Sequence, residues 1–142
     1  MKKLCLLLPL LLLLCACAQA QTVTLAQLES QALNTYGADE YVLADGDFVS
    51  TNFPSALHVK QARVYLSKQG DGREFGIFEL TDGRYAAQTV AAIRTYLENE
   101  EQAVRSLASL YPADDLNARL HRLQNVRIEN KGNLVSYYLV DA

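Results

Sequence analysis

The sequence predicts an α+β domain: an antiparallel sheet of about four strands, made of two hairpins, with helices on one face and the order α-β-β-α-α-β-β. Two observations support this prediction. Strand-like alternation occurs at residues 60–80 and 126–140, each time around a short turn containing glycine, while residues 24–36, 83–110 and 112–125 repeat apolar side chains every three or four positions. Strands joined by short turns pair antiparallel, and helices elsewhere in the chain must then cover the sheet.

The first helix is expected to begin at Thr24 and to end at Gly37. Thr24 and Gln27 have the spacing of a capping box, in which each side chain bonds the backbone N–H of the other residue. Glycine is favoured just past a helix end. The apolar face would consist of Leu25, Leu28, Ala32, Leu33 and Tyr36.

Residues 38–58 are too apolar for a free loop, so we expect short helical turns or an irregular cover packed on the sheet, with Pro54 breaking any longer helix. Strands at 60–68 and 74–80 follow, joined by a turn at 69–72. Asp82 can cap a helix that runs to Leu110, about 42 Å long at 1.5 Å per residue. Strands of seven residues span only about 23 Å. This helix must therefore overhang the sheet or break, and we expect the irregularity near residues 99–101.

The last elements are a short helix after Pro112, which ends at Asn125, and a hairpin from Val126 to Val140 that turns through residues 130–133. Leu116, Leu120 and Leu123 share one face of the short helix.

The first twenty residues have the order of a bacterial export signal. Lys2 and Lys3 precede a leucine-rich run, which is followed by small residues. The run is shorter than the roughly 20 apolar residues that span a bilayer, and it contains Pro9. A retained transmembrane anchor is therefore disfavoured.

Residues 14–17, Leu-Cys-Ala-Cys, resemble the lipobox of bacterial lipoproteins, which makes Cys17 the predicted lipidation site. Cys15 fits less well, because the bulky Leu14 comes just before it. Two alternatives stay open: secretory cleavage after Ala18-Gln19-Ala20, and cysteines that merely fill a signal peptide. Two acyl chains on one cysteine would anchor the protein stably to the membrane lipid.

This interpretation divides the chain into a signal peptide at 1–16, a lipidated Cys17 with a short tether at 17–23, and one globular domain at 24–142. Removing both signal lysines would change the formal net charge from −3 to −5, which argues against a nucleic-acid partner. No cysteine follows Cys17, so a disulfide cannot stabilise the domain. A tether of six residues reaches roughly 20 Å, which keeps the domain near the membrane.

The polar residues suggest chemistry only weakly. His58 and His121 have no metal-ligand spacing around them. Asp45-Gly46-Asp47, with Asp39 and Glu40 nearby, invites a calcium site but lacks a closing glutamate, and a turn with Asp47 as helix cap is favoured. Gly70-Asp71-Gly72 is interpreted as a turn. An aromatic patch of Tyr65, Phe75, Tyr137 and Tyr138 could bind a sugar or peptide, but we expect residues 41–57 to cover it.

Several short segments are similar to domain-of-unknown-function family 4358, small lipoproteins found mostly in Gram-positive Clostridia. The segments are Asp47-Phe48-Val49, Asn52-Phe53-Pro54, residues 74–78, Leu110-Tyr111-Pro112, and residues 132–135 before Tyr137-Tyr138. The resemblance covers nearly all of the mature chain and departs at Leu134, where the family pattern suggests a tyrosine. It implies a cell-surface lipoprotein at the outer face of one membrane and supplies no activity.

The sequence therefore favours a lipid-anchored extracytoplasmic lipoprotein that acts as a non-enzymatic binding or adaptor module near the membrane, with a membrane or envelope protein as partner. No metal, cofactor or catalytic residue is assigned. The alternatives are a secreted, unlipidated protein, or an envelope enzyme or ligand sensor whose site is assembled from separated residues such as Asp45, Asp47, Glu101 and His58.

Overall fold

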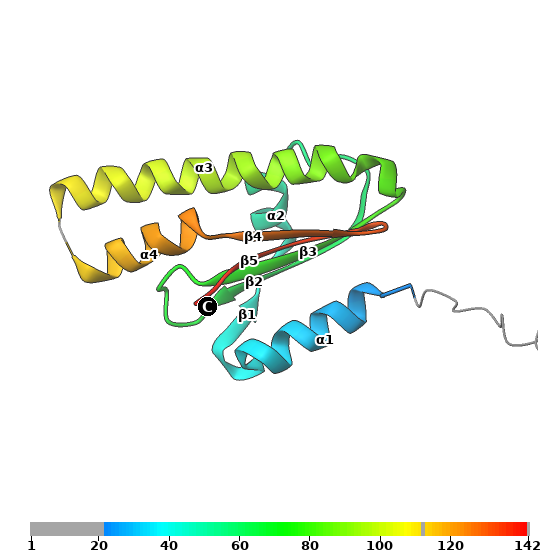
Figure 1. Cartoon of the computed structure of the whole chain (residues 1–142), viewed down its shortest axis with the longest axis horizontal. Helices are drawn as coiled ribbons and strands as arrows, with labels where there is room; N and C mark the ends of the chain where they lie inside the picture. The colour runs from blue at the N-terminus through cyan, green and yellow to red at the C-terminus, as the bar shows by residue number, and fades with distance from the viewer. Residues whose placement is uncertain (1–21, 112, 142) are drawn as a thin grey trace, which may run out of the picture.

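The computed structural model describes residues 22–111 and 113–141, and these form an α+β fold around one five-stranded antiparallel sheet (Figure 1). The predicted class is confirmed. The sheet has the order β1-β2-β3-β5-β4. Its strands are β1 (Tyr41–Leu43), β2 (Val59–Ser67), β3 (Glu74–Leu80), β4 (Arg127–Lys131) and β5 (Leu134–Leu139). Both predicted hairpins are present, and β1 makes the sheet one strand wider than expected.

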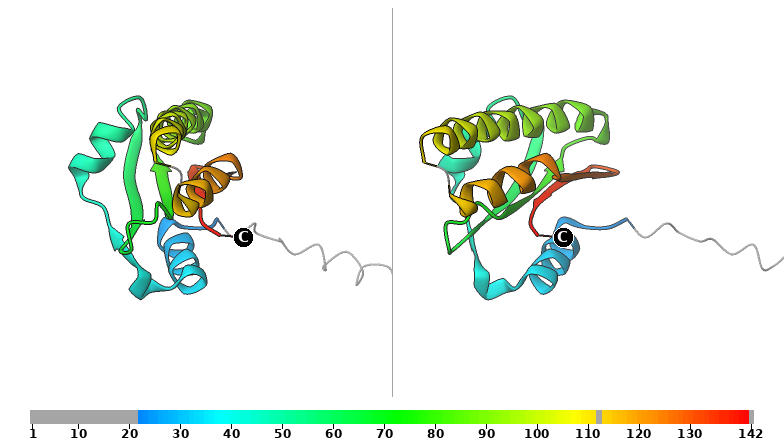
Figure 2. Two further views of the ribbon diagram at one scale, coloured as in Figure 1. Left: turned by 90° about the vertical axis from the view of Figure 1, so that its left-hand side faces the viewer. Right: turned by 60° about the vertical axis from the view of Figure 1, so that its left-hand side comes forward.

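The helices cover both faces of the sheet, not one as the sequence suggested (Figures 1 and 2). Helix α1 (Leu25–Tyr36) packs on one face, where Leu25 and Leu28 join Ile77 and Leu134. The opposite face is covered by α2 (Gly46–Asn52), α3 (Ala86–Leu110) and α4 (Asp114–Gln124). The central strands β3 and β5 are buried along nearly their whole length, so both of their faces need a cover.

The main core lies between the sheet and α3, and the predicted cover at residues 38–58 completes it. Phe53, just after α2, has its ring centroid 5.1 Å from that of Phe78 in β3 and 4.7 Å from that of Tyr96 in α3. Phe48 and Val49 pack against the same cluster. The expected cover is thus real, and it consists of α2 and the segment that follows it, whereas β1 joins the sheet as an edge strand.

Helix α3 continues unbroken through residues 99–101, where an irregularity was expected. A short 3₁₀ turn, Gly83–Tyr85, precedes it, and the Asp82 side chain accepts a hydrogen bond from the Arg84 N–H at 2.9 Å. The C-terminal half of α3 projects past the sheet, and α4 turns back to pack along it (Figure 1). The expected mismatch in length is therefore resolved by overhang, which α4 covers.

Helix α1 has the predicted ends. The Thr24 hydroxyl accepts from the Gln27 N–H at 3.3 Å, and the Gln27 side chain accepts from the Thr24 N–H at 2.8 Å. Gly37 follows with φ of 92°, a conformation that favours glycine. Among the described residues, no helix combines the length and apolar character of a membrane span.

Gly76 in β3 lets a tyrosine ring lie directly on the strand. It pairs with Tyr137 of β5, and a Cβ atom at Gly76 would lie 2.3 Å from Cε1 of that ring. Tyr137 is fully buried. The glycine is thus needed for close approach of the ring rather than for an unusual backbone angle.

Candidate functional site

The predicted lipidation site lies outside the described residues, because Cys17 belongs to the segment 1–21. The described chain starts at Thr22, and α1 begins at Leu25. Only a few residues would therefore separate a lipid on Cys17 from the folded domain.

The acidic segment 39–47 does not gather its carboxylates around one point. The Glu40 carboxylate accepts from the Gln69 amide at 2.8 Å. Glu40 precedes β1 and Asp45 follows it, so the two carboxylates lie at opposite ends of this strand. Asp45 caps α2 by accepting from the Phe48 N–H at 2.8 Å, so the cap is Asp45 and not Asp47, which lies in the first turn. No group of three or more potential metal ligands occurs among residues 22–111 and 113–141.

The remaining polar candidates lie on separate elements. His58 stacks on Tyr85 with ring centroids 3.7 Å apart. Glu101 accepts from Arg105 one helical turn along α3. His121 is exposed on α4, as expected. The structure thus gives Asp45, Asp47, Glu101 and His58 no common site.

The aromatic patch divides between the two faces of the sheet. Tyr65 and Phe75 stack with centroids 4.9 Å apart, and Phe75 stacks on Tyr138 at 6.3 Å. Residues of α1, not residues 41–57, provide most of the cover there, although Tyr41 also contacts Phe75. Tyr137 points to the opposite face, where Phe53 covers it as expected.

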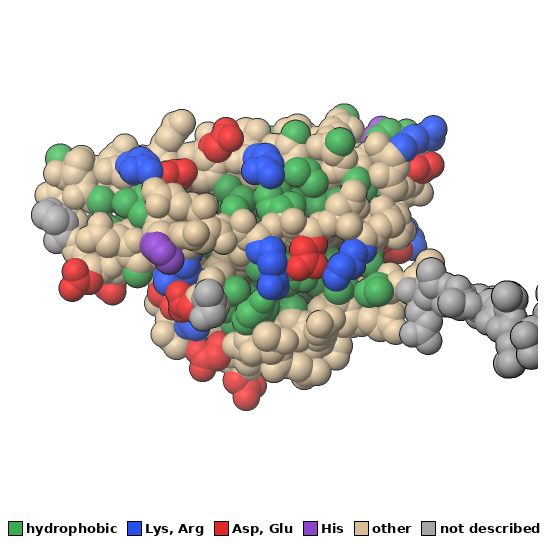
Figure 3. Space-filling model, viewed as in Figure 1, with side chains coloured by type: hydrophobic (Ala, Val, Ile, Leu, Met, Phe, Trp, Pro, Cys, Tyr) green, Lys and Arg blue, Asp and Glu red, His purple; other side chains and the backbone are tan. Residues whose placement is uncertain are grey.

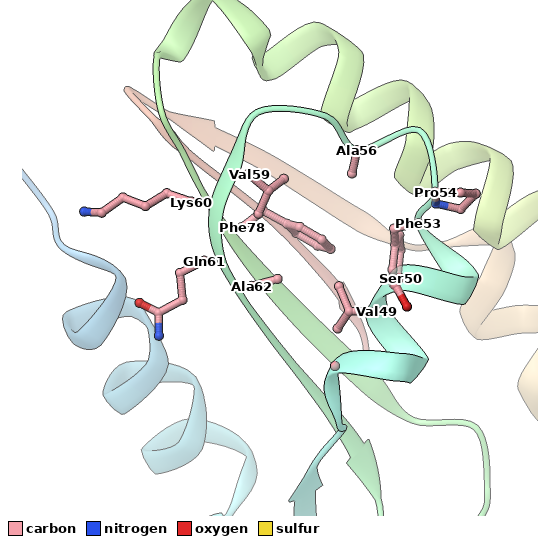
Figure 4. A pocket seen from close by; sticks show the side chains of 11 residues that line it. Val49, Ser50, Phe53, Pro54, Ala56, Val59, Lys60, Gln61, Ala62 and Phe78 are labelled. Atoms are coloured by element: carbon pink, nitrogen blue, oxygen red, sulfur yellow. The ribbon is translucent and has the colours of Figure 1, made fainter.

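A pocket of about 440 Å³ opens between α2 and the first half of β2 (Figure 4). Side chains of Val59, Ala62 and Phe78 form its floor on the sheet, and the opposite wall comes from α2 and the segment after it. The wall residues are Gly46, Val49, Ser50, Phe53, Pro54 and Ala56. Lys60 and Gln61 complete the lining, and their side chains point away from the apolar floor (Figure 4). Most of the pocket is thus uncharged, which suits an apolar ligand group.

A buried carboxylate, Glu74, lies at the start of β3 beneath α3. The residue is 6 % exposed. The Tyr96 and Tyr137 hydroxyls each donate to its carboxylate at 2.9 Å. Burial raises the pKa of Glu74 to about 7, against the opposing effect of these two hydrogen bonds. Burial also raises the pKa values of both tyrosines, so both hydroxyls stay protonated donors at neutral pH.

No cation neutralises Glu74 directly among the described residues. Arg119 of α4 is engaged by Glu100 of α3 in an ion pair. The Glu74 carboxylate is enclosed by core side chains and does not line the α2–β2 pocket, so a ligand there would not reach it. Its role in this arrangement is to join β3, β5 and α3.

Two arginines of α4 hold the turn between β2 and β3. Arg122, 9 % exposed, donates to the Asp71 carbonyl at 2.5 Å and to the Asp141 carboxylate at 3.0 Å. The Arg119 side chain lies against Gly72, where a Cβ atom would come within 2.6 Å of its Nε. The predicted turn at residues 69–72 is therefore also a packing surface for α4.

The sequence did not predict the α2–β2 pocket or the buried cluster of Glu74, Tyr96 and Tyr137. A usable signal for the cluster was Glu74 itself, a carboxylate that begins an otherwise apolar strand. The pocket has no such signal, since it arises from the way α2 stands beside β2.

The fold and site define an α+β domain with an apolar pocket beside its sheet. Comparisons with protein-family models, with curated proteins and with solved structures found no match to this chain. The resemblance to family 4358 and the location that it implies stay predictions.

Proposed function

We propose that this protein is an extracytoplasmic lipoprotein, anchored through Cys17, whose domain is a non-enzymatic binding module held near the membrane surface. The observation that carries the binding role is the α2–β2 pocket. It falls within the size range of ligand pockets, and Lys60 is the one titratable residue in its lining. Such a lining favours binding over acid–base or nucleophilic catalysis, which needs positioned titratable groups.

The anchor rests on the lipobox-like residues 14–17 and on the short distance to the fold. The capping box makes Thr24 the N-cap of α1, which leaves residues 18–23 as tether. A tether of this length reaches about 20 Å. A partner in or near the membrane is therefore favoured over one farther away.

An enzyme would need reactive groups brought to one place. The residues that the sequence offered for this role, Asp45, Asp47, Glu101 and His58, act locally on different elements. This separation supports the binding role.

Replacing Cys17 by serine is expected to release the protein from the membrane fraction, because the acyl chains have no other attachment point. The measurement is the distribution of the protein between membrane and soluble fractions, together with the mass of the mature N-terminal peptide. Cys15→Ser is the matched control and should stay on the membrane. An unmodified N-terminal peptide that begins at Gln21 would contradict the anchor.

Chemical cross-linking in intact cells, followed by purification through a C-terminal tag, is expected to recover a membrane or envelope protein. The same partner should be reduced or lost with Cys17→Ser, since the unanchored domain is no longer concentrated at the membrane. Equal recovery of the partner from wild type and Cys17→Ser would show that partner binding does not depend on the lipid anchor. Absence of any cross-linked protein in both would count against the adaptor role.

A further inference from the structure

Half of strand β2 has a partner on one side only. On its outer side, β1 pairs with residues 65–67, and the ladder ends where the Ala44 N–H donates to the Val64 carbonyl at 2.8 Å. The chain then leaves the sheet to form α2. Among the described residues, no strand pairs with residues 59–63 on this side.

The hydrogen-bond pattern shows which peptide groups face this open edge. The Val64 carbonyl and the Lys68 N–H bond to the β1 side, whereas the Ser67 N–H bonds to the β3 side at Arg73. Peptide groups alternate along an antiparallel strand. The N–H and carbonyl of Ala62 therefore point outward, in line with the β1 ladder, and residue 62 needs neither group to pair with β3.

The α2–β2 pocket lies along this same open edge. Ala62 and Val59 contribute to its floor, while α2 forms the far wall (Figure 4). Backbone N–H and carbonyl groups on the open edge of β2 thus lie beside the apolar α2–β2 pocket. This combination is what strand addition uses: the backbone pairs with the edge, and every second side chain enters a pocket.

The other edge of the sheet, β4, is lined by charged side chains along most of its length. Strand β4 carries an ion-paired row of Arg127, Glu129 and Lys131. Basic and acidic side chains cross the front of the molecule at the level of β4 (Figure 3). Charges on an edge discourage pairing with another chain. The open stretch of β2 carries two charged side chains, Lys60, which pairs with Glu79 at 3.0 Å, and Arg63, which pairs with Glu29 at 3.7 Å. Because both charges already have an opposite partner, an uncharged segment is favoured there over a charged one.

We propose that an extended, uncharged segment of a partner protein adds to the sheet beside residues 60–63 of β2, continuing the β1 ladder, with an aliphatic side chain in the α2–β2 pocket. The segment runs antiparallel to β2, as β1 does. A bulge at Lys60 shifts the register between Val59 and Gln61, which limits the added strand to a few residues. This proposal deepens the binding role given above and rests on it, but it does not depend on the lipid anchor.

The test uses residues 22–142, which contain the whole described fold and its core. Linear eight-residue peptides from a displayed library are selected on this domain, with counter-selection on Ala62→Pro. Proline removes the outward N–H of residue 62, and it is tolerated where an edge N–H does not serve the ladder. We expect enriched peptides with an aliphatic residue that bind Ala62→Pro at least about tenfold more weakly, while Ala62→Ser, which keeps the N–H, loses less binding than Ala62→Pro.

A second measurement does not depend on the folding of the proline variant. The best peptide is N-methylated at each position in turn, and binding to the unaltered domain is measured. Strand addition predicts loss at alternate positions, because only every second peptide N–H faces β2. Equal loss at all positions, or no peptide enriched over the counter-selection, would overturn the proposal. Self-association of the domain that Ala62→Pro abolishes would also overturn it, in favour of edge-to-edge pairing between two copies.

These outcomes are separate from those of the anchor experiment. A peptide that binds with alternating sensitivity supports strand addition even if Cys17 carries no lipid. If Cys17 is lipidated but no peptide binds, the anchor is supported and the strand-addition proposal is contradicted.

Discussion

Replacing Glu74 by glutamine is expected to remove most of the loss of stability that this protein undergoes between pH 5 and pH 8. The pKa of Glu74 rises from 4.5 to about 7 on folding, because the carboxyl is buried. Between these two values the native protein keeps a proton that the unfolded chain has released. The stabilising contribution is therefore fully present below pH 4.5 and is lost as the pH rises through 7.

The expected size of this pH dependence follows from the shift in the pKa of Glu74. A change of this magnitude corresponds to about 3 kcal/mol of unfolding free energy over the full range, or about 2 kcal/mol between pH 5 and pH 8. The charged groups that face Glu74 act in opposite directions: Glu100 of α3 raises its pKa and Arg119 of α4 lowers it.

Urea unfolding of wild-type protein and Glu74→Gln at pH 5, 6, 7 and 8 measures the effect. The amide resembles the protonated carboxyl, so both proteins should have similar stability at pH 5, and the variant should be more stable at pH 8. Glu98→Gln, an exposed change on helix α3, which lies over Glu74, is the matched control and should keep the wild-type slope. Parallel pH profiles for wild type and Glu74→Gln would show that Glu74 does not hold its proton in the folded protein.

Replacing Gly76 by alanine is expected to destabilise the domain by about 3 kcal/mol, because overpacking and a lost buried hydrogen bond act together. The added methyl group would overlap the Tyr137 ring, which is buried and tied to Glu74 through its hydroxyl. The ring has to move, and the hydrogen bond to Glu74 lengthens or breaks. The denaturation midpoint should fall accordingly.

Gly46→Ala provides the control for this change. No atom lies within 4 Å of the position that a Cβ at Gly46 would occupy, and this residue is the first of α2. Alanine there should leave stability unchanged or raise it slightly. If Gly76→Ala unfolded at the wild-type midpoint, the close approach of Tyr137 to β3 would not be required by the fold.

The parts of the fold that the sequence predicted well depend on local signals. The capping box at Thr24, the glycine turns and the two hairpins each involve residues close together in the chain, so spacing alone identifies them. Strand β1 was missed because a three-residue strand has no room for a periodic pattern. The position of α1 on the opposite face could have been inferred from β3, since Phe75 and Phe78 point to different faces of one strand and both are buried.

The candidate sites were less predictable because they depend on contacts between distant segments. The hydrogen bond between Tyr137 and Glu74 joins β5 to β3, and Phe53 meets Tyr96 across the core. The α2–β2 pocket depends on where α2 leaves the sheet after Ala44. Asp45, interpreted as one member of an acidic turn, became the cap of that helix because its side chain reaches the Phe48 N–H.

The order of strands in the sheet has a consequence for when this protein can fold. Strand β5 lies between β3 and β4, yet β3 ends at Leu80 and β5 begins at Leu134. Until β5 has been synthesised, the side of β3 that β5 occupies in the sheet has no partner strand. Closing so long a separation is slow compared with forming a hairpin. The interval before β5 pairs with β3 is therefore the period of greatest risk of aggregation.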